Sequence, residues 1–327
     1  MQSLSPTLLF LASAAAAFGG IRVLLPFLKS RAILDHPNER SSHETPTPKG
    51  GGIVLAPIIV LCWVVIGLSE GSSGFLIWGL SGCALILAAL SWFDDLKGLS
   101  PAVRLLAQIG AVVFIMIFQP NTEPYFQGLL PVWLDSFLAG LLWVWFINLF
   151  NFMDGIDGIT GVESLIIGGG VALIGGGAPA LLGLAIAGAA LGFLKWNWHP
   201  AKIFLGDVGS VPFGFLLGWL LLDLAASGQW AAALILPAYY LADSGLTLVR
   251  RALKGEKVWQ AHRQHFYQQA TQRGLTHGFV SVAVLVVGIL LIGLAYVSSI
   301  GESVSATIAA LVLSIAFLIF LRGWNKS

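Results

Sequence analysis

Two adjacent carboxylates stand at the end of an apolar stretch. Asp94 and Asp95 follow Trp92 and Phe93 where the apolar run 75–93 ends. Because neighbouring carboxylates repel each other, one of them ionises less readily unless a cation compensates. The pair could supply a general base and a partner for a metal ion or a phosphate group. The simpler interpretation is a helix end that meets water, and the sequence does not separate the roles of the two acids.

A second group repeats amides and carboxylates at a spacing that suits one helix face. Asn148, Asn151, Asp154 and Asp157 follow one another at every third position. On a helix such residues are neighbours. Hard cations such as Mg²⁺ bind oxygen ligands of this kind and keep positions for substrate phosphates. The spacing does not match a calcium-binding EF-hand loop. We therefore expect a polar stripe for a metal or phosphates, with a Gly-rich turn facing solvent as the alternative.

A glycine-rich segment precedes the apolar run 211–226. It reads Gly206-Asp-Val-Gly-Ser210, with Asp207 at its second position. Glycines allow a close backbone approach, and a helix N-terminus presents free N–H groups to an anion. Lys202 lies just upstream and could neutralise a phosphate. A capped turn with a membrane-surface lysine is the simpler alternative.

Two histidines flank an arginine near the C-terminal third of the chain. His262 and His265 enclose Arg263, and four further basic residues precede them: Arg250, Arg251, Lys254 and Lys257. A zinc site would need more ligands than this pair. The basic surroundings favour anion binding through imidazole and guanidinium groups, and a solvated loop is the alternative. The other histidines of interest are expected to be structural: His36, His199 and His277.

One acid lies inside an apolar run. Asp243 stands within the stretch 230–249. An acid at membrane depth is a functional hypothesis by default. Pairing with Tyr239 or with a polar group of another helix is the structural alternative, and both remain open.

The elements that carry these residues are strongly apolar. Of 327 residues, 57% are hydrophobic and 10% are charged, against about 25% charged in a soluble domain, and the mean hydropathy is +0.86. These values exclude a soluble globular protein and a disordered chain. A net charge of +1 excludes a nucleic-acid-binding protein, which needs a basic excess. Cys62 and Cys83 lie in apolar runs and form no disulfide or metal pattern.

The apolar stretches predict an all-α, polytopic integral membrane protein that forms a single domain over residues 1–327. A helix needs about 20 apolar residues to cross a bilayer, and unbroken runs favour helices over a β-barrel. The first run lacks the features of a cleaved signal peptide and is expected to be retained. Gly168–Gly170 and Gly175–Gly177 are expected to allow close helix packing. The eleven expected spans are 6–28, 51–68, 75–93, 103–119, 133–152, 160–176, 178–195, 211–226, 230–249, 278–297 and 304–322.

The charges of the loops predict an orientation. When loops are numbered alternately, one side holds all 17 lysines and arginines, with Arg22 near the inner end of the first span counted among them, and the opposite loops hold only acids. The positive-inside rule then puts the N-terminus outside and the C-terminus in the cytoplasm. The polar motifs also fall on the cytoplasmic side, so we expect an active site assembled from loops on a rigid scaffold. These loops are about 29–50, 94–102, 153–159, 196–210 and 250–277.

Five motifs in this order resemble one family. They are D-x-P-x-x-R-x-x-H from Asp35 followed by P-x-G-G-G, the Asp-Asp pair, N-x-x-N-x-x-D-G-x-D-G from Asn148, P-A-K-I-F-L-G-D-x-G-S, and H-R-x-H-x-Y-Q ending at Gln268. They resemble the polyprenyl-phosphate N-acetylhexosamine-1-phosphate transferases, glycosyl transferase family 4. The resemblance implies that the phosphate of undecaprenyl phosphate attacks the β-phosphate of a UDP-N-acetylhexosamine and releases UMP. It also implies a multi-pass protein of the bacterial cytoplasmic (inner) membrane, whose partners include membrane lipids and, as one option, a second copy in a homodimer.

The resemblance also implies residue roles. Asp207 would bind Mg²⁺, with Mn²⁺ as a substitute, and Asn151 would be a second ligand. Asp94 would be the base or the lipid-phosphate partner, with Asp95 beside it. The remaining expected substrate contacts are Arg40, His43, Arg104, Asn148, Asp154, Asp157, Lys202, His262, Arg263 and His265.

The last motif, Ala261-His-Arg-Gln-His-Phe-Tyr-Gln268, is closest to the branch that initiates O-antigen or lipopolysaccharide units. Sugars of that branch include 6-deoxy sugars such as N-acetylfucosamine and N-acetylquinovosamine, and a muramoyl-pentapeptide substrate is disfavoured. One alternative is a UDP-N-acetylglucosamine transferase of another cell-wall pathway. A cation-coupled transporter is the alternative from another class, but it would place its acids near the bilayer midplane, where Asp243 is the main residue to suit it. The sequence leaves open whether the reaction takes one step or passes through a covalent enzyme intermediate.

Overall fold

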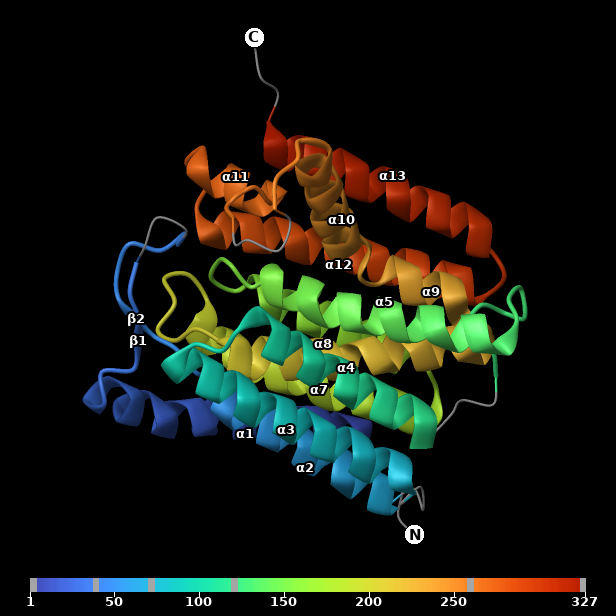
Figure 1. Cartoon of the computed structure of the whole chain (residues 1–327), viewed down its shortest axis with the longest axis horizontal. Coiled ribbons are helices and arrows are strands. Elements are labelled where there is room, and N and C mark those ends of the chain that lie inside the picture. Colours follow the sequence, from blue (N-terminus) through green and yellow to red (C-terminus); the bar gives the residue numbers. More distant parts are fainter. Residues whose placement is uncertain (1–4, 38–40, 70–73, 119–122, 258–261, 324–327) are drawn as a thin grey trace.

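The computed structural model describes residues 5–37, 41–69, 74–118, 123–257 and 262–323. Long helices lie side by side along one direction (Figure 1) and form one bundle around an apolar core. The elements in chain order are α1 (Pro6–Ser30), β1 (Leu34–Asp35), β2 (Thr47–Pro48), α2 (Gly52–Ser69), α3 (Phe75–Lys97), α4 (Pro101–Phe118), α5 (Val132–Phe152), α6 (Ile159–Ile174), α7 (Gly177–Asn197), α8 (Asp207–Leu224), the π-helix η1 (Ala225–Gln229), α9 (Trp230–Ile235), α10 (Ala238–Leu253), α11 (Phe266–Gln272), α12 (His277–Ser299) and α13 (Ser303–Arg322).

The helical architecture confirms the all-α membrane fold. Within the described residues, nine helical segments are long and apolar enough to cross a membrane. The sequence predicted eleven spans, and the difference has two sources. The stretch 160–176 becomes α6, which has 16 residues and is therefore shorter than the bilayer core at about 1.5 Å per residue. The stretch 230–249 does not form one helix.

The chain breaks within that stretch at Pro237. η1 joins α8 to α9 across a kink at Gly228, whose φ angle is +91°, and α10 begins just after the proline. Proline has no N–H group and its ring obstructs the preceding turn, so a continuous helix is disfavoured here. In Figure 1, α10 crosses the long helices at a steep angle. Its buried residues include Asp243, Ser244 and Thr247, so the face of α10 that meets the protein is polar.

Glycines bring the central helices together. A methyl group added at Gly168 of α6 would lie 2.6 Å from the carbonyl oxygen of Gly183 in α7. The close packing predicted for this glycine is confirmed. It is wrong for Gly176 and Gly177, which meet no heavy atom within 4 Å and have positive φ angles of 59° and 50° at the start of α7. These two glycines make the turn between α6 and α7 because their backbone conformation disfavours a side chain.

The loops that carry the polar motifs gather at one end of the bundle. The segments that follow α1, α3, α5 and α7, together with α11, lie at the left in Figure 1. We call this the polar end. Successive helices run in opposite directions, so alternate loops meet at the same end. The clustering predicted from the sequence is therefore confirmed, whereas the side of the membrane that this end faces stays a prediction.

A short backbone ladder joins two of these loops. The N–H groups of Gly50 and Gly51 donate to the carbonyl oxygen of Phe204 at 3.1 and 2.9 Å, and the N–H of Phe204 donates to Pro48 at 2.8 Å. Beyond the ladder, Gly52 of α2 packs against the backbone of Gly209 in α8 without room for a side chain. The ladder fixes the segment that carries Lys49 beside the segment that carries Asp207.

Candidate functional site

Three carboxylates and two basic side chains meet at the start of α8. The Lys49 Nζ atom lies 2.6 Å from Oδ1 of Asp95. Arg104 Nη1 lies 3.1 Å from Asp94 Oδ2 and 3.5 Å from Asp207 Oδ2. The two acids of the predicted pair therefore have different partners: Asp95 pairs with Lys49 and accepts a hydrogen bond from the Val208 N–H at 3.2 Å, while Asp94 pairs with Arg104.

The charge of this cluster has a direct effect on Lys49. Burial alone would lower the pKa of Lys49, but the carboxylates of Asp95 and Asp207 outweigh it and raise the pKa above its ordinary value. Lys49 is thus a permanent cation beside three acids. Lys49 is not among the site residues predicted from the sequence, although its position directly before the three glycines at 50–52 was a signal.

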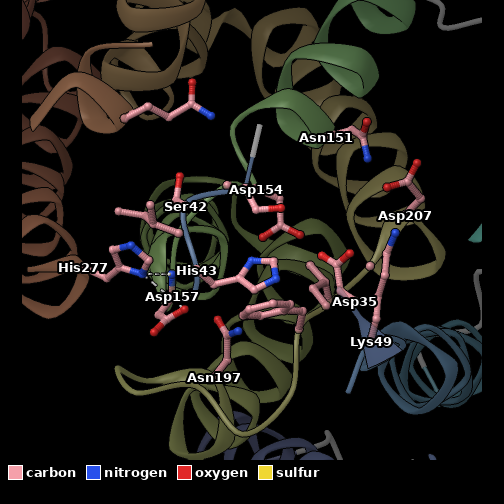
Figure 2. A pocket seen from close by; sticks show the side chains of 17 residues that line it. Asp35, Ser42, His43, Lys49, Asn151, Asp154, Asp157, Asn197, Asp207 and His277 are labelled. Carbon is pink, nitrogen blue, oxygen red and sulfur yellow. Dashed lines mark hydrogen bonds and ion pairs between the residues drawn. The ribbon is translucent and has the colours of Figure 1, made fainter. Parts of the chain in front are cut away.

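Oxygen donors that could hold a metal ion lie next to this cluster. Asn151 at the end of α5 donates from Nδ2 to the Ser210 hydroxyl at 2.8 Å. Figure 2 shows the side chains of Asn151 and Asp207 projecting towards each other at one side of a cavity. A carboxylate and an amide oxygen suit Mg²⁺, which keeps several waters and binds substrate phosphates rather than needing a complete protein cage. The structure therefore brings the two residues predicted as metal ligands together.

The cavity has a volume of about 380 Å³ and opens at the polar end. His43 and Asp154 lie between Asp157 on one side and Asp207 on the other (Figure 2), and the His43 ring meets the Phe204 ring edge-on at 4.9 Å between centroids. The cavity is lined by Asp35, Ser41, Ser42, His43, Lys49, Asn151, Asp154, Gly155, Ile156, Asp157, Asn197, Phe204, Leu205, Gly206, Asp207, Gln268 and His277.

The shared helix face predicted for Asp154 and Asp157 is wrong. Residues 153–158 form a non-helical turn between α5 and α6, and Gly158 has a φ of +83°, which ends any helical continuation. Asp157 turns towards two histidines, at 2.7 Å from His199 Nδ1 and 3.3 Å from His277 Nδ1.

These contacts govern the ionisation of Asp157. Burial would raise the pKa of the Asp157 carboxyl, but hydrogen bonds from His277 and His199 outweigh it and lower the pKa. Within the described residues, these three residues are the one group of His, Cys, Asp or Glu whose ligand atoms all lie within 4.8 Å of one another. Because the His199 and His277 rings already contact the carboxylate directly, we interpret the group as a clamp that joins the turn before α6, the loop after α7, and α12.

Asp154 differs from Asp157 in having few compensating contacts. Burial raises the pKa of its carboxyl to about 7, against a hydrogen bond from Thr160 that lowers it. The pKa in the folded state is thus above the unfolded value of about 3.9. Stability from this proton is fully present below that value and is lost as the pH rises through about 7.

We therefore expect the unfolding temperature of the protein in EDTA to fall between pH 5 and pH 8, and Asp154→Asn to flatten this dependence. One pKa unit corresponds to about 1.4 kcal/mol, so the effect amounts to a few kcal/mol. Thermal unfolding in detergent at a series of pH values measures it. Identical slopes for both proteins would contradict this role of Asp154.

The histidines of the motif are more buried than a solvated loop would make them. His265 is 2% exposed and its Nδ1 atom lies 3.1 Å from Asp243. His262 stacks on His265 at 4.8 Å between centroids, and burial, followed by the charge of His265, lowers the pKa of His262 to about 4. From this segment Gln268 lines the cavity. Substrate contacts by His262, Arg263 and His265 stay predictions.

The remaining predicted contacts divide between the cavity and its surroundings. Asn148 donates to Gln108 of α4 at 2.6 Å and does not line the cavity. Lys202 lies over the Trp196 ring at 5.4 Å, outside the cavity. Arg40 lies outside the described residues. Asn197 and Gln268 also line the cavity. Neither was predicted as a site residue, because the fold brings them to the cavity from distant parts of the chain.

The fold and the site define a class: a polytopic membrane protein with a carboxylate-rich, cation-containing cavity at one end of its helix bundle. The family model for glycosyl transferase family 4 matches residues 77–225. A probable undecaprenyl-phosphate N-acetylglucosaminyl 1-phosphate transferase of Bacillus subtilis is 28% identical over 83% of this chain and 79% of its own length. A decaprenyl-phosphate N-acetylglucosaminephosphotransferase of Mycolicibacterium smegmatis is 27% identical over 93% and 84%.

A third relative, an undecaprenyl-phosphate alpha-N-acetylglucosaminyl 1-phosphate transferase of Escherichia coli O157:H7, is 27% identical over 91% of this chain and 86% of its own length. The chain is therefore similar to polyprenyl-phosphate N-acetylglucosamine-1-phosphate transferases over most of its length, and the match to glycosyl transferase family 4 supports the family that its motifs resemble.

Proposed function

We propose that this protein transfers an N-acetylhexosamine 1-phosphate from a UDP-sugar to undecaprenyl phosphate and releases UMP. The observation that carries the proposal is the cavity at the polar end, where Asp207 and Asn151 face the same space and Lys49 and Arg104 stand beside them. Phosphoryl transfer depends on positioning and charge neutralisation more than on covalent chemistry. Oxygen donors and fixed cations at one membrane surface meet both needs.

In this proposal the donor diphosphate occupies the cavity. Asp207 and Asn151 would hold Mg²⁺, which when bound would neutralise phosphate charge. Lys49 supplies a further positive charge at the cavity wall, and Asp95 holds its ammonium group in place. The Phe204 ring and His43 offer an aromatic surface on the same wall.

The acceptor phosphate would approach from the side of Arg104. An oxygen of that phosphate attacks the β-phosphorus of the UDP-sugar, and the bond from this phosphorus to the bridging oxygen of UMP breaks. The products are polyprenyl-diphospho-sugar and UMP, so atoms and charge balance. Arg104, which is 40% exposed in its side chain, can contact the acceptor phosphate, and Asp94 orients the guanidinium group.

A groove on the side of the bundle supports a long isoprenoid tail. It has a volume of about 440 Å³ and lies between α5, α8, α9, α10 and the loop before α5. Its lining is almost wholly apolar and includes Leu142, Trp143, Trp145, Phe146 and Trp230. The same helix, α5, carries Asn148 and Asn151 one to two turns nearer the polar end. An acceptor with its tail in the groove would keep its phosphate at the membrane surface near the site.

This groove gives a prediction about the acceptor. We expect Trp145→Ala to raise the KM for undecaprenyl phosphate about tenfold, because the tail loses apolar contact area, with little effect on a short-chain prenyl phosphate. Trp78→Ala is the matched control, since Trp78 lies on α3 outside the groove and is 52% exposed. Equal KM values for wild type and Trp145→Ala with the long acceptor would exclude the groove as the tail site.

The names of the relatives suggest which sugar to test first. The three relatives above carry N-acetylglucosamine in their names, and N-acetylglucosamine is therefore the first donor to try. The 6-deoxy sugars of the O-antigen branch are the next candidates, because of the motif at His262–Gln268. The proposed pathway is initiation of O-antigen, lipopolysaccharide or another envelope glycan at the cytoplasmic face of the inner membrane.

The decisive experiment combines the purified protein, undecaprenyl phosphate and Mg²⁺ with a panel of UDP-N-acetylhexosamines and identifies the released nucleotide. UMP that appears with one donor, and that disappears when EDTA is added, is the expected result. UDP instead of UMP would mean glycosyl transfer and would overturn the mechanism. Release of neither nucleotide with any donor would overturn the proposed function.

The transporter alternative loses the acid that suited it best. Asp243 accepts hydrogen bonds from the backbone N–H groups of Phe266 and Tyr267 at 3.0 and 3.3 Å. Its carboxylate is thus engaged within the protein and does not line either of the two cavities described above.

A further inference from the structure

Asp243 is a fully buried carboxylate that gathers five donors. Its Oδ1 atom accepts from the Phe266 N–H at 3.0 Å, and lies 3.1 Å from His265 Nδ1 and 3.4 Å from the Thr247 hydroxyl. Its Oδ2 atom accepts from the Tyr267 N–H at 3.3 Å and from the Tyr239 hydroxyl at 3.4 Å. A residue with 0% exposure cannot touch a substrate, so these contacts must explain its presence.

The contacts fix the beginning of α11. Phe266 and Tyr267 are the first residues of this helix, and their N–H groups have no acceptor within the helix. A carboxylate accepts such N–H groups more strongly than a neutral group does. Because α10 supplies the carboxylate, the position of α11 is tied to α10 rather than to the surrounding loop.

Tyr267 connects the beginning of α11 to the turn beside the cavity. Its hydroxyl donates to the Phe152 carbonyl oxygen at 3.2 Å, at the end of α5. A methyl group added at Gly155 would lie 3.0 Å from the Tyr267 ring and 3.2 Å from Gln268 Nε2. The turn that presents Asp154 therefore rests directly on Tyr267 and Gln268. Asp154, Gly155 and Gln268 all line the cavity.

We propose that Asp243 is a positioning residue for the donor site: it holds segment 265–268 against turn 152–155, so that Gln268 and Asp154 face the cavity. This inference rests on the proposed function for the identity of the donor. The hydrogen bonds from α10 to α11 and from Tyr267 to Phe152 carry it independently of that identity.

The substitution Asp243→Asn tests the proposal because it keeps the shape and replaces one acceptor oxygen with a donor. That NH₂ group would face N–H groups that need an acceptor. We expect the dissociation constant and the KM for UDP-N-acetylglucosamine to rise at least tenfold, with the KM for undecaprenyl phosphate unchanged. Amide hydrogen exchange at Phe266 and Tyr267 should accelerate in the variant.

Asp135→Asn is the matched control. Asp135 is 3% exposed and likewise accepts two successive backbone N–H groups, those of Tyr125 and Phe126 at 3.0 and 2.9 Å, at the far end of α5. We expect it to lower the unfolding temperature similarly without changing donor affinity. Equal loss of donor affinity in both variants would mean general destabilisation and would overturn the proposal, as would unchanged donor affinity in Asp243→Asn.

Tyr267→Phe keeps the proposal falsifiable if Asp243→Asn does not fold. It removes only the hydroxyl that bonds to Phe152, and we expect a smaller rise in donor KM, about threefold to fivefold. No rise would contradict the path through Tyr267.

If the wild-type protein binds no UDP-sugar, the proposed function fails instead. In that case protection of the Phe266 and Tyr267 amides in wild type, and its loss in Asp243→Asn, still supports the tie, and equal exchange in both overturns it.

Discussion

Asp207→Asn is expected to abolish turnover, by at least a thousandfold, while the protein still inserts in the membrane and unfolds at nearly the wild-type temperature. Asp207 is a quarter exposed at the beginning of α8, so the folded state loses little when its charge is removed. A metal ligand is different, because loss of a carboxylate removes both a ligand and the charge that attracts the cation.

Activity assays over a range of Mg²⁺ concentrations measure this effect. A variant that regains activity at high Mg²⁺ would support weakened metal binding as the cause. Normal turnover at ordinary Mg²⁺ would exclude Asp207 as the metal ligand. Ser210→Ala, which removes only the hydroxyl bonded to Asn151, is a milder companion and should lower turnover about tenfold.

Asp94→Asn is expected to lower turnover by a hundredfold to a thousandfold and to leave UDP-sugar binding intact. Asp94 lies 3.1 Å from Arg104 and also accepts a hydrogen bond from the Leu99 N–H, whereas it is absent from the residues that line the donor cavity. Its loss therefore acts on the acceptor side, either through the lost base or through the freed guanidinium group.

Calorimetric binding of the UDP-sugar, measured beside turnover, separates a loss of donor affinity from a loss of catalysis. Asp95→Asn is the comparison, because Asp95 holds Lys49 at 2.6 Å and its loss should weaken donor binding. If the two variants lose donor affinity equally, the assignment of Asp94 to the acceptor is wrong.

Much of the architecture could be predicted from the sequence because it depends on local composition. Apolar runs of sufficient length form helices, and alternate loops between antiparallel helices reach the same end, which is why Asp94, Asn151 and Asp207 meet. The break at Pro237 was also a local signal, but the apolar residues on both sides of it concealed it. The apolar residues around Glu163 likewise concealed this buried acid of α6, which is 2% exposed.

The parts of the site that the sequence did not predict depend on contacts between distant segments. Lys49 reaches Asp95 only because the ladder to Phe204 aligns two loops. Asp157 turns away from Asp154 because Gly158 adopts a positive φ angle and two histidines from other loops are within reach. The engagement of Asp243 by α11 is similarly invisible, because spacing along the chain does not report which helix end comes to rest against a buried acid.

The contact of Gly52 with Gly209 makes one side of the polar end more rigid than the other. A side-chain carbon added at Gly209 would lie 3.0 Å from the Gly52 Cα atom, so the two backbones leave no room to slide or separate without losing close packing. We therefore expect Lys49 and Asp207, which flank this contact, to keep a constant mutual spacing while substrates bind. Adjustment to donors of different shape falls to the opposite wall, where Gln268 stands on a short helix that one buried carboxylate keeps in place.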